Sequence, residues 1–320
     1  MAETDRRVTL ADIRDARARI AGRVHRTPML TSQTLAGLVG GPVFLKAESL
    51  QKTGSFKPRG ATNAIRRLGP DARTRGVVTI SAGNHAQAVA YAAAPEQIRC
   101  VVVMPASAVQ SKVAACRAYG AEVVLHGEVA EAWALFERLQ VEQGLIPVHP
   151  FDHPDVIAGQ GTVGLEIHED VPDAALVVVP IGGGGLISGI ATALRELNPR
   201  TRIVGVEPNG SNAMHAALAA GHPVRLARID SIADGLGAPA VSDRTLDVVR
   251  RLVDEVVEVS DAEIVAAIRL VLERAKLLVE PAGAAAVAAL MAGRVRVGSG
   301  PTVAVLSGAN VDLERLKGWL

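Results

Sequence analysis

The sequence contains few aromatic residues, which make up 2% of its 320 positions, and few lysines, which supply six of its 34 basic residues. Because acidic residues number 33, the chain also carries almost no net charge. A protein of this composition lacks the positive field and the stacking side chains with which nucleic-acid-binding proteins hold their ligands. We therefore expect no nucleic acid partner.

Long apolar runs and paired cysteines are missing as well. No stretch approaches the roughly 20 apolar residues that span a bilayer, and the charged N-terminus lacks the apolar core of a secretory signal. Cys100 and Cys116 have no CxxC partner, which favours free, largely buried thiols over a disulfide or a metal site. These absences predict a cytoplasmic protein with no membrane partner.

Short apolar runs rich in β-branched residues recur along the chain, and stretches of helical period separate most of them. This alternation is typical of an α/β protein, in which helices cover both faces of a parallel sheet. The strand-like runs are residues 43–48, 76–80, 100–105, 121–126, 145–149, 175–182, 203–208, 255–259 and 302–308.

The spacing of these runs is tightest between residues 76 and 149. It predicts a small domain, residues 72–152, inserted into a large domain that is formed by residues 1–71 and 153–320. Ligands of open α/β sheets bind at the carboxyl ends of the strands, so we expect the site to face the cleft between the two domains.

Lys57 stands in an unusual setting, "TGSFKPRG", where glycine and serine precede it and proline follows. A lysine that serves solubility normally lies on the polar face of a helix, so this one is predicted to be confined. Its local sequence alone leaves a structural or surface role open. The scarcity of lysine leaves few other amines for chemistry.

Four consecutive glycines, Gly182, Gly183, Gly184 and Gly185, follow an apolar run and open a helical pattern. Without Cβ atoms, such a loop can close its backbone N–H groups around an anion that the helix dipole also favours, and phosphate is the natural guest. The spacing lacks the third glycine of the dinucleotide fingerprint and the lysine of a P-loop. A tight turn without a ligand is the alternative.

Small polar residues follow other predicted strands. Ser81 and Asn84 either cap the next helix or receive a carboxylate together with the loop amides, while Asn84 also reaches a ring oxygen. Ser307 is either a turn serine or a hydrogen-bonding group for a ligand, and Glu280 precedes a helix that begins with proline. Together with the glycines and Lys57, these residues predict a phosphorylated cofactor bonded to lysine, of which pyridoxal phosphate is the common one.

The order of these motifs resembles a known family. "SFKPRGA", "SAGNHAQ", "AGQGTVGLEI", "GGGGLISG", "VEPAG" and "LSGANVD" are similar to the threonine/serine dehydratases of the fold-type II pyridoxal phosphate enzymes, a group that includes serine racemase and hydroxyaspartate dehydratase. The resemblance covers residues 25–315. It implies a fold like that of the tryptophan synthase β chain, with two open, twisted, mostly parallel sheets, the cofactor in the cleft between the domains, and a homodimer.

The resemblance also implies a role for each site residue. Lys57 would form a Schiff base with the cofactor and then act as the base at the substrate's α-carbon, with Ser81 as the second catalytic residue. Asn84 would bond to the ring hydroxyl, and Ser307 would face the pyridine nitrogen. The other groups are Phe56 and Glu280 near the ring, Gly182, Gly183, Gly184, Gly185 and Leu186 at the phosphate, and Ser81, Ala82, Gly83, Asn84 and His85 at the substrate carboxylate.

The implied reaction removes water from a β-hydroxy amino acid, L-threonine or L-serine, and gives a 2-oxo acid and ammonia. A dehydratase of hydroxyaspartate or phenylserine and a serine racemase are alternatives. Racemases of the family carry a second serine where this chain has Ala82, so racemisation is expected to be minor. β-Replacement synthases carry threonine where this chain has His85. Outside these enzymes, a ligand-sensing protein without activity and a nucleotide-dependent dehydrogenase are the alternatives.

Metal binding and regulation receive little support. Glu207 is the candidate for a divalent cation, but mostly amides follow it, and hard cations prefer several carboxylate oxygens. The prolines in "HPFDHPD" (residues 149–155) disfavour a zinc site. Because the last motif lies close to Leu320, no C-terminal regulatory domain is expected. Candidates for the wall around the substrate side chain are Phe151, Asp152, Leu236 and Gly237.

Overall fold

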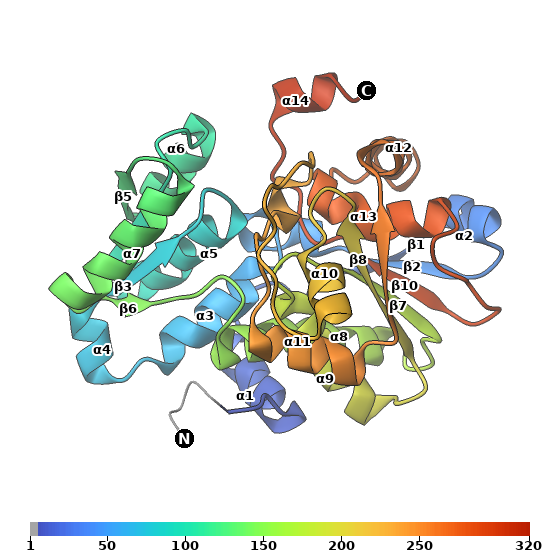
Figure 1. Ribbon diagram of the computed structural model, residues 1–320. Helices are drawn as coiled ribbons and strands as arrows, with labels where there is room; N and C mark the ends of the chain where they lie inside the picture. Colours follow the sequence, from blue (N-terminus) through green and yellow to red (C-terminus); the bar gives the residue numbers. More distant parts are fainter. Residues whose placement is uncertain (1–5) are drawn as a thin grey trace.

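The computed structural model describes residues 6–320, which form two sheets with helices on both faces of each (Figure 1). The larger sheet has six strands, all parallel to their neighbours except the first pair. Their order across the sheet is β1 (Met29–Thr31), β2 (Val43–Lys46), β10 (Thr302–Val305), β7 (Leu176–Pro180), β8 (Arg202–Pro208) and β9 (Glu255–Val259).

Helices cover both faces of this sheet because its strands alternate two apolar sets of side chains, Leu176 and Val178 toward one face and Val177 and Val179 toward the other. The first face packs against α2 (Gln33–Val39), α12 (Asp261–Leu270) and α13 (Pro281–Met291). The second packs against α8 (Pro154–Asp170), α9 (Gly185–Leu197), α10 (Ala213–Ala220) and α11 (Asp243–Leu252).

The smaller sheet is wholly parallel and lies to one side of the larger one in Figure 1. Its strand order is β5 (Glu122–Leu125), β4 (Cys100–Met104), β3 (Val77–Ile80) and β6 (Ile146–Pro147). One face packs against α3 (Lys57–Arg67), α5 (Asn84–Ala93) and α6 (Gln110–Ala118), the other against α7 (Val129–Gln143). The remaining helices are α1 (Leu10–Ile20), α4 (Pro70–Arg75) and α14 (Leu313–Lys317).

Every predicted strand-like run contains a strand, and the α/β class with two mostly parallel sheets is confirmed. Only the short antiparallel edge strand β1 was missed, because three residues give too little periodicity to detect. Both cysteines are free and buried, as expected. The strands of the smaller sheet all lie between residues 77 and 147, while the domain boundaries themselves stay a prediction. In the described residues, every helix is too short or too polar to cross a bilayer.

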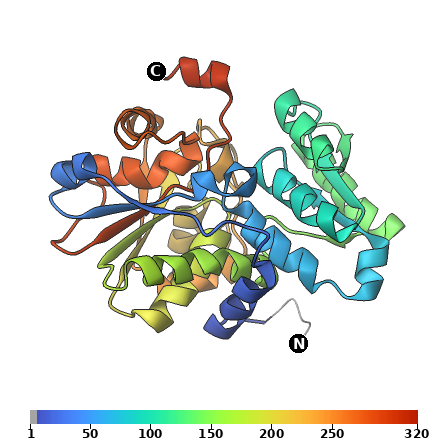
Figure 2. The same cartoon turned by 180° about the vertical axis from the view of Figure 1, so that it is seen from behind.

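Glycines on α8 bring together the two helices that carry the predicted lysine and the glycine loop. A Cβ at Gly159 would lie 2.6 Å from the Cα of Gly60 on α3, and a Cβ at Gly161 would lie 3.0 Å from the carbonyl oxygen of Gly189 on α9. The missing side chains therefore allow backbone-to-backbone approach on both sides of α8. In the view from behind, α8 lies across one face of the larger sheet, and α1 packs against α8 (Figure 2).

A buried ion cluster fixes α3 in place. Arg59 donates two hydrogen bonds to Glu48, at 2.7 and 2.8 Å, and two to Glu166 on α8, also at 2.7 and 2.8 Å. Lys46 is wholly buried beside them and bonds to Glu166 at 2.5 Å. Two cations thus balance two carboxylates, and the planar guanidinium satisfies both carboxylates with paired bonds. Lys57 lies two residues before Arg59, so the cluster also anchors the start of α3.

Candidate active site

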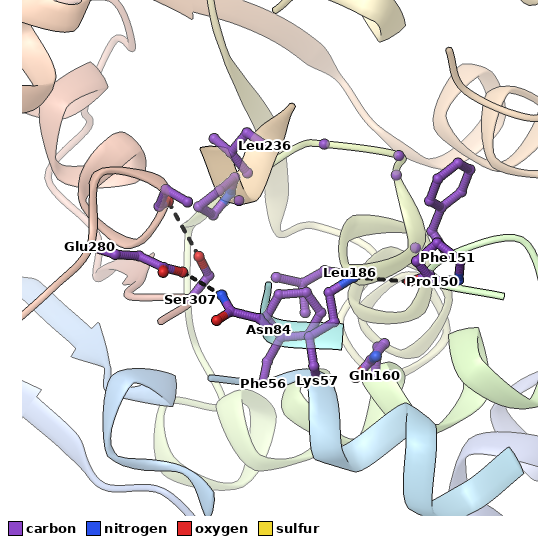
Figure 3. Close-up of a pocket in the computed structure, with 17 residues that line it drawn as sticks. Phe56, Lys57, Asn84, Pro150, Phe151, Gln160, Leu186, Leu236, Glu280 and Ser307 are labelled. Atoms are coloured by element: carbon purple, nitrogen blue, oxygen red, sulfur yellow. Dashed lines mark hydrogen bonds between the residues drawn. The ribbon is translucent and has the colours of Figure 1, made fainter. Parts of the chain in front are cut away.

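Lys57 is the first residue of α3 and lies in a pocket at the carboxyl ends of the strands (Figure 3). Its Nζ atom donates a hydrogen bond to the carbonyl oxygen of Pro150 at 2.9 Å. Burial lowers the pKa of Lys57 to about 8, although the carboxylate of Glu280 acts in the opposite direction. Near neutral pH the amine is therefore close to its titration, where it can act as a nucleophile or a base.

The glycine loop joins β7 to α9. Gly184 has φ +90°, a left-handed conformation that glycine adopts without strain. A Cβ at Gly183 would collide with the ring of Phe151, and one at Gly185 would lie 3.0 Å from the Cβ of the same phenylalanine. The first N–H groups of α9 have no acceptor within the helix, so they can bind an anion such as phosphate.

Asn84, the first residue of α5, lies on another wall of the pocket. Its Nδ2 atom donates to Oε1 of Glu280 at 2.6 Å, and its Oδ1 atom accepts from Nδ2 of Asn310 at 2.8 Å. Burial raises the pKa of Glu280 to about 7, opposed by the hydrogen bond from Asn84. This wall therefore joins an amide to a carboxyl group that titrates near neutral pH.

Ser307 follows β10 and offers an uncharged hydroxyl to the pocket. Its Oγ atom donates to the carbonyl oxygen of Ala282 at 3.2 Å, so the oxygen retains lone pairs for a ligand. The predicted cofactor-binding residues all line this pocket: Phe56, Lys57, Asn84, Gly182, Gly183, Gly184, Gly185, Leu186, Glu280 and Ser307.

Of the predicted carboxylate-binding loop, residues 81–85, only Asn84 lines this pocket. The residues that do not line it are Ser81, Ala82, Gly83 and His85. The hydroxyl of Ser81 accepts the N–H of Gly83 at 3.1 Å. Burial, helped by the charge of Lys57, lowers the pKa of His85 to about 3, so this imidazole is neutral. Its Nε2 atom lies 2.9 Å from a backbone carbonyl oxygen and must carry the proton.

Among the four candidates for the side-chain wall, Phe151 and Leu236 line the pocket, whereas Asp152 and Gly237 do not. Asp152 instead accepts a bond from Arg244 at 2.9 Å. The fold also brings here several residues that the sequence did not single out: Pro150, Gln160, Pro180, Gly235 and Ala282 in the lining, and Asn310 behind it. Gln160 and Asn310 stood within quoted motifs, but nothing in the sequence showed that their side chains would reach the site.

Glu207, the predicted candidate for a metal ligand, already binds backbone N–H groups. Both carboxylate oxygens of Glu207 accept N–H groups at the start of α10, from Met214 at 2.9 Å and His215 at 2.8 Å. Burial raises the pKa of Glu207 to about 8, and Glu258 on the next strand adds to that effect. Among residues 6–320, no three His, Cys, Asp or Glu side chains gather in a way that could hold a metal ion.

Comparison with known proteins agrees with this geometry. The family model described as "Pyridoxal-phosphate dependent enzyme" matches residues 20–308. The L-threonine ammonia-lyases of Geobacter sulfurreducens and Thermotoga maritima are 47% and 44% identical, over 95% and 97% of this chain and 76% and 77% of theirs. The solved structure of maize serine racemase is 41% identical, with a TM-score of 0.94 over 97% of this chain and 96% of that one.

Proposed function

This chain belongs to the family of pyridoxal-phosphate dependent enzymes, and we propose that it is an ammonia-lyase that converts L-threonine, and also L-serine, into a 2-oxo acid and ammonia. The lyase class follows from the identity to L-threonine ammonia-lyases over almost the whole chain. The observation that carries the proposal is the confinement of one amine, Lys57, in the same pocket as a glycine loop at a helix start.

The residues present fit pyridoxal phosphate. The Cβ-free loop and the free N–H groups of α9 suit its phosphate, and the partly deprotonated amine of Lys57 suits its aldehyde. Asn84 would donate to the ring oxygen and Ser307 would face the ring nitrogen. When bound, this cofactor supplies an aldehyde that bonds to amines and a ring that accepts electrons from the substrate's α-carbon.

Lys57 would hold the cofactor until the substrate amine displaces it, and would then remove the proton from the substrate's α-carbon. A pKa of about 8 makes the freed amine a competent base at neutral pH. In the net reaction the α-proton and the β-hydroxyl would leave the substrate as one water, and one water that adds to the resulting imine would release ammonia, so the net products are the 2-oxo acid and ammonia. Ser307 offers a hydroxyl, not a carboxylate, and so would not hold the ring nitrogen protonated through an ion pair.

The pocket lining favours a small, uncharged substrate side chain. Lys57 is the one cationic side chain among the lining residues, so the second carboxylate of hydroxyaspartate would find no ion partner there. Phe151 already packs against the glycine loop and limits the room for the ring of phenylserine. Turnover of the four β-hydroxy amino acids in parallel tests the choice. Faster ammonia release from hydroxyaspartate or phenylserine than from threonine would overturn it.

The function itself is tested by the absorbance of the purified protein with pyridoxal phosphate. We expect a band near the visible edge that borohydride abolishes while fixing the cofactor to Lys57, and ammonia release that requires no thiol. The variant K57A should lose both the fixed cofactor and the activity. Full deamination by K57A, or no uptake of cofactor by the unchanged chain, would refute the proposal.

A serine racemase is the second candidate, because the maize enzyme of that name has nearly the same fold. Ala82 has no group that could donate a proton to the second face of the substrate, so we propose that racemisation is minor. Chiral analysis of serine after incubation tests this. Rapid formation of D-serine relative to ammonia would reverse the order of the two candidates.

Location and assembly are further parts of the proposal. We propose a cytoplasmic homodimer, on the basis of the absence of paired cysteines and the prevalence of symmetric dimers. Sedimentation of the loaded protein measures the assembly, and a monomer at micromolar concentration would contradict it.

A further inference from the structure

A chain of side-chain hydrogen bonds runs behind the pocket through Asn310, Asn84 and Glu280. Asn310 donates from Nδ2 to the carbonyl oxygen of Thr53 at 2.6 Å and to Oδ1 of Asn84 at 2.8 Å. Asn84 then donates from Nδ2 to Oε1 of Glu280 at 2.6 Å. Four groups from separate parts of the sequence are thus joined in one line.

The carbonyl oxygen of Thr53, at one end of this line, fixes the direction of both amides. It can only accept a hydrogen bond, so Nδ2 of Asn310 must face it, and Nδ2 of Asn84 in turn faces Oε1 of Glu280. Asn310 therefore uses both of its N–H bonds, one on Thr53 and one on Asn84. Asn84 uses its oxygen and one N–H bond, and is left with one N–H for which residues 6–320 provide no acceptor.

The backbone next to these hydrogen bonds has an unusual conformation at Thr53 and glycines where a side chain would block Asn310 or Glu280. Thr53 adopts φ +57°, which is costly for a residue other than glycine, and its carbonyl is the one that Asn310 reaches. A Cβ at Gly54 would lie 2.5 Å from Oδ1 of Asn310, and a Cβ at Gly308 would collide with Oε1 of Glu280. Strain of this kind persists only where the surrounding structure holds it.

We infer that Asn310 and Glu280 are positioning residues, which hold the Asn84 amide so that it presents a donor, and not its carbonyl oxygen, to the bound ligand. The inference rests on the proposed function, because the ligand oxygen that would accept this bond is the ring oxygen of pyridoxal phosphate. If the Asn84 amide were flipped, its Oδ1 atom would face the ring oxygen of the cofactor, and two acceptors would meet without a hydrogen between them. Glu280 thereby receives a role that its place before a helix did not disclose.

The decisive variant is N310D, which keeps the shape of the side chain but cannot donate to Thr53 or Asn84. We expect the dissociation constant of pyridoxal phosphate to rise about tenfold, the size of one hydrogen bond to a charged group. N84A should lose the same amount of cofactor affinity as N310D. The two variants should also shift the absorbance band of the bound cofactor equally. The double variant should lose no more than either single one, because Asn310 acts through Asn84.

The matched control is N198D, since Asn198 also donates from Nδ2 to a backbone carbonyl, that of Pro172 at 3.0 Å, but lies at the far end of α9. It should bind the cofactor as the unchanged protein does. E280Q retains an acceptor oxygen and should stay closer to the unchanged protein than E280A. Thermal unfolding shows whether N310D is folded. If it is not, N310A takes its place in the comparison of the single and double variants.

Two outcomes overturn the inference while leaving the proposed function intact: unchanged cofactor affinity and spectrum in the Asn310 variants, or losses that multiply in the double variant. The second would mean that Asn310 acts on the fold independently of Asn84. No uptake of pyridoxal phosphate by the unchanged protein would instead refute the proposed function, so the two failures are distinct.

Discussion

The Nζ atom of Lys57 lies 2.9 Å from the carbonyl oxygen of Pro150, and the next residue, Phe151, packs against Gly183 and Gly185. One short segment after β6 therefore contacts both the amine and the glycine loop. Lys57 and the glycine loop lie 125 or more residues apart in the sequence. Pro150 and Phe151, which lie between them in the sequence, contact both parts and hold them together in one site.

The first prediction concerns the rate at which the protein captures pyridoxal phosphate. Because only the neutral amine attacks the aldehyde, the rate should rise with pH and level off above the pKa of Lys57, about 8. In E280Q the midpoint should move to lower pH, since the carboxylate raises the pKa of Lys57. Stopped-flow absorbance measures both. A midpoint near that of an ordinary lysine would show that the amine is not confined.

The second prediction concerns the ion cluster beneath α3. R59M should cost about 3–5 kcal/mol in the free energy of unfolding, because it leaves the carboxylates of Glu48 and Glu166 buried with too few partners. The control R99M removes an exposed pair with Glu122 and should cost less than about 1 kcal/mol. Urea unfolding of the cofactor-free proteins compares them, and equal losses would refute the special role of the buried cluster.

The third prediction concerns the glycine loop. G183A should weaken binding of pyridoxal phosphate about tenfold or more, since the new methyl group must displace Phe151. Adding F151A should recover part of the affinity. Gly37 lies in open space on α2, so G37A should bind as the unchanged protein does. Fluorescence titration measures all three, and normal affinity in G183A would show that the loop does not need its glycines.

The fourth prediction concerns metal ions. Because Glu207 already accepts two backbone N–H groups at the start of α10, we expect dialysis against a chelator to leave the turnover of the loaded enzyme unchanged. Turnover is measured before and after adding Mg²⁺ or Ca²⁺ to the dialysed protein. A loss on dialysis that either cation restores would show that the carboxylate also serves a metal.

Several site features followed from residue types alone. Four glycines at the start of a helix exclude side chains whatever surrounds them, and a lysine between phenylalanine and proline at a helix start is restricted by its own backbone. The contacts of Gln160, Asn310 and Pro150 could not be foreseen, because each depends on elements that are distant in sequence. Asp152 illustrates the opposite case, since its ion pair with Arg244 holds it outside the pocket lining.

The sequence by itself determined the layers of this protein and the chemistry available to it, because strand and helix periods, glycine runs and scarce lysines are local properties. Tertiary structure alone decided the direction of the Asn84 amide and the lowered pKa of Lys57. Both depend on burial and on partners brought together from separate strand ends, and neither burial nor partner can be read from one stretch of chain.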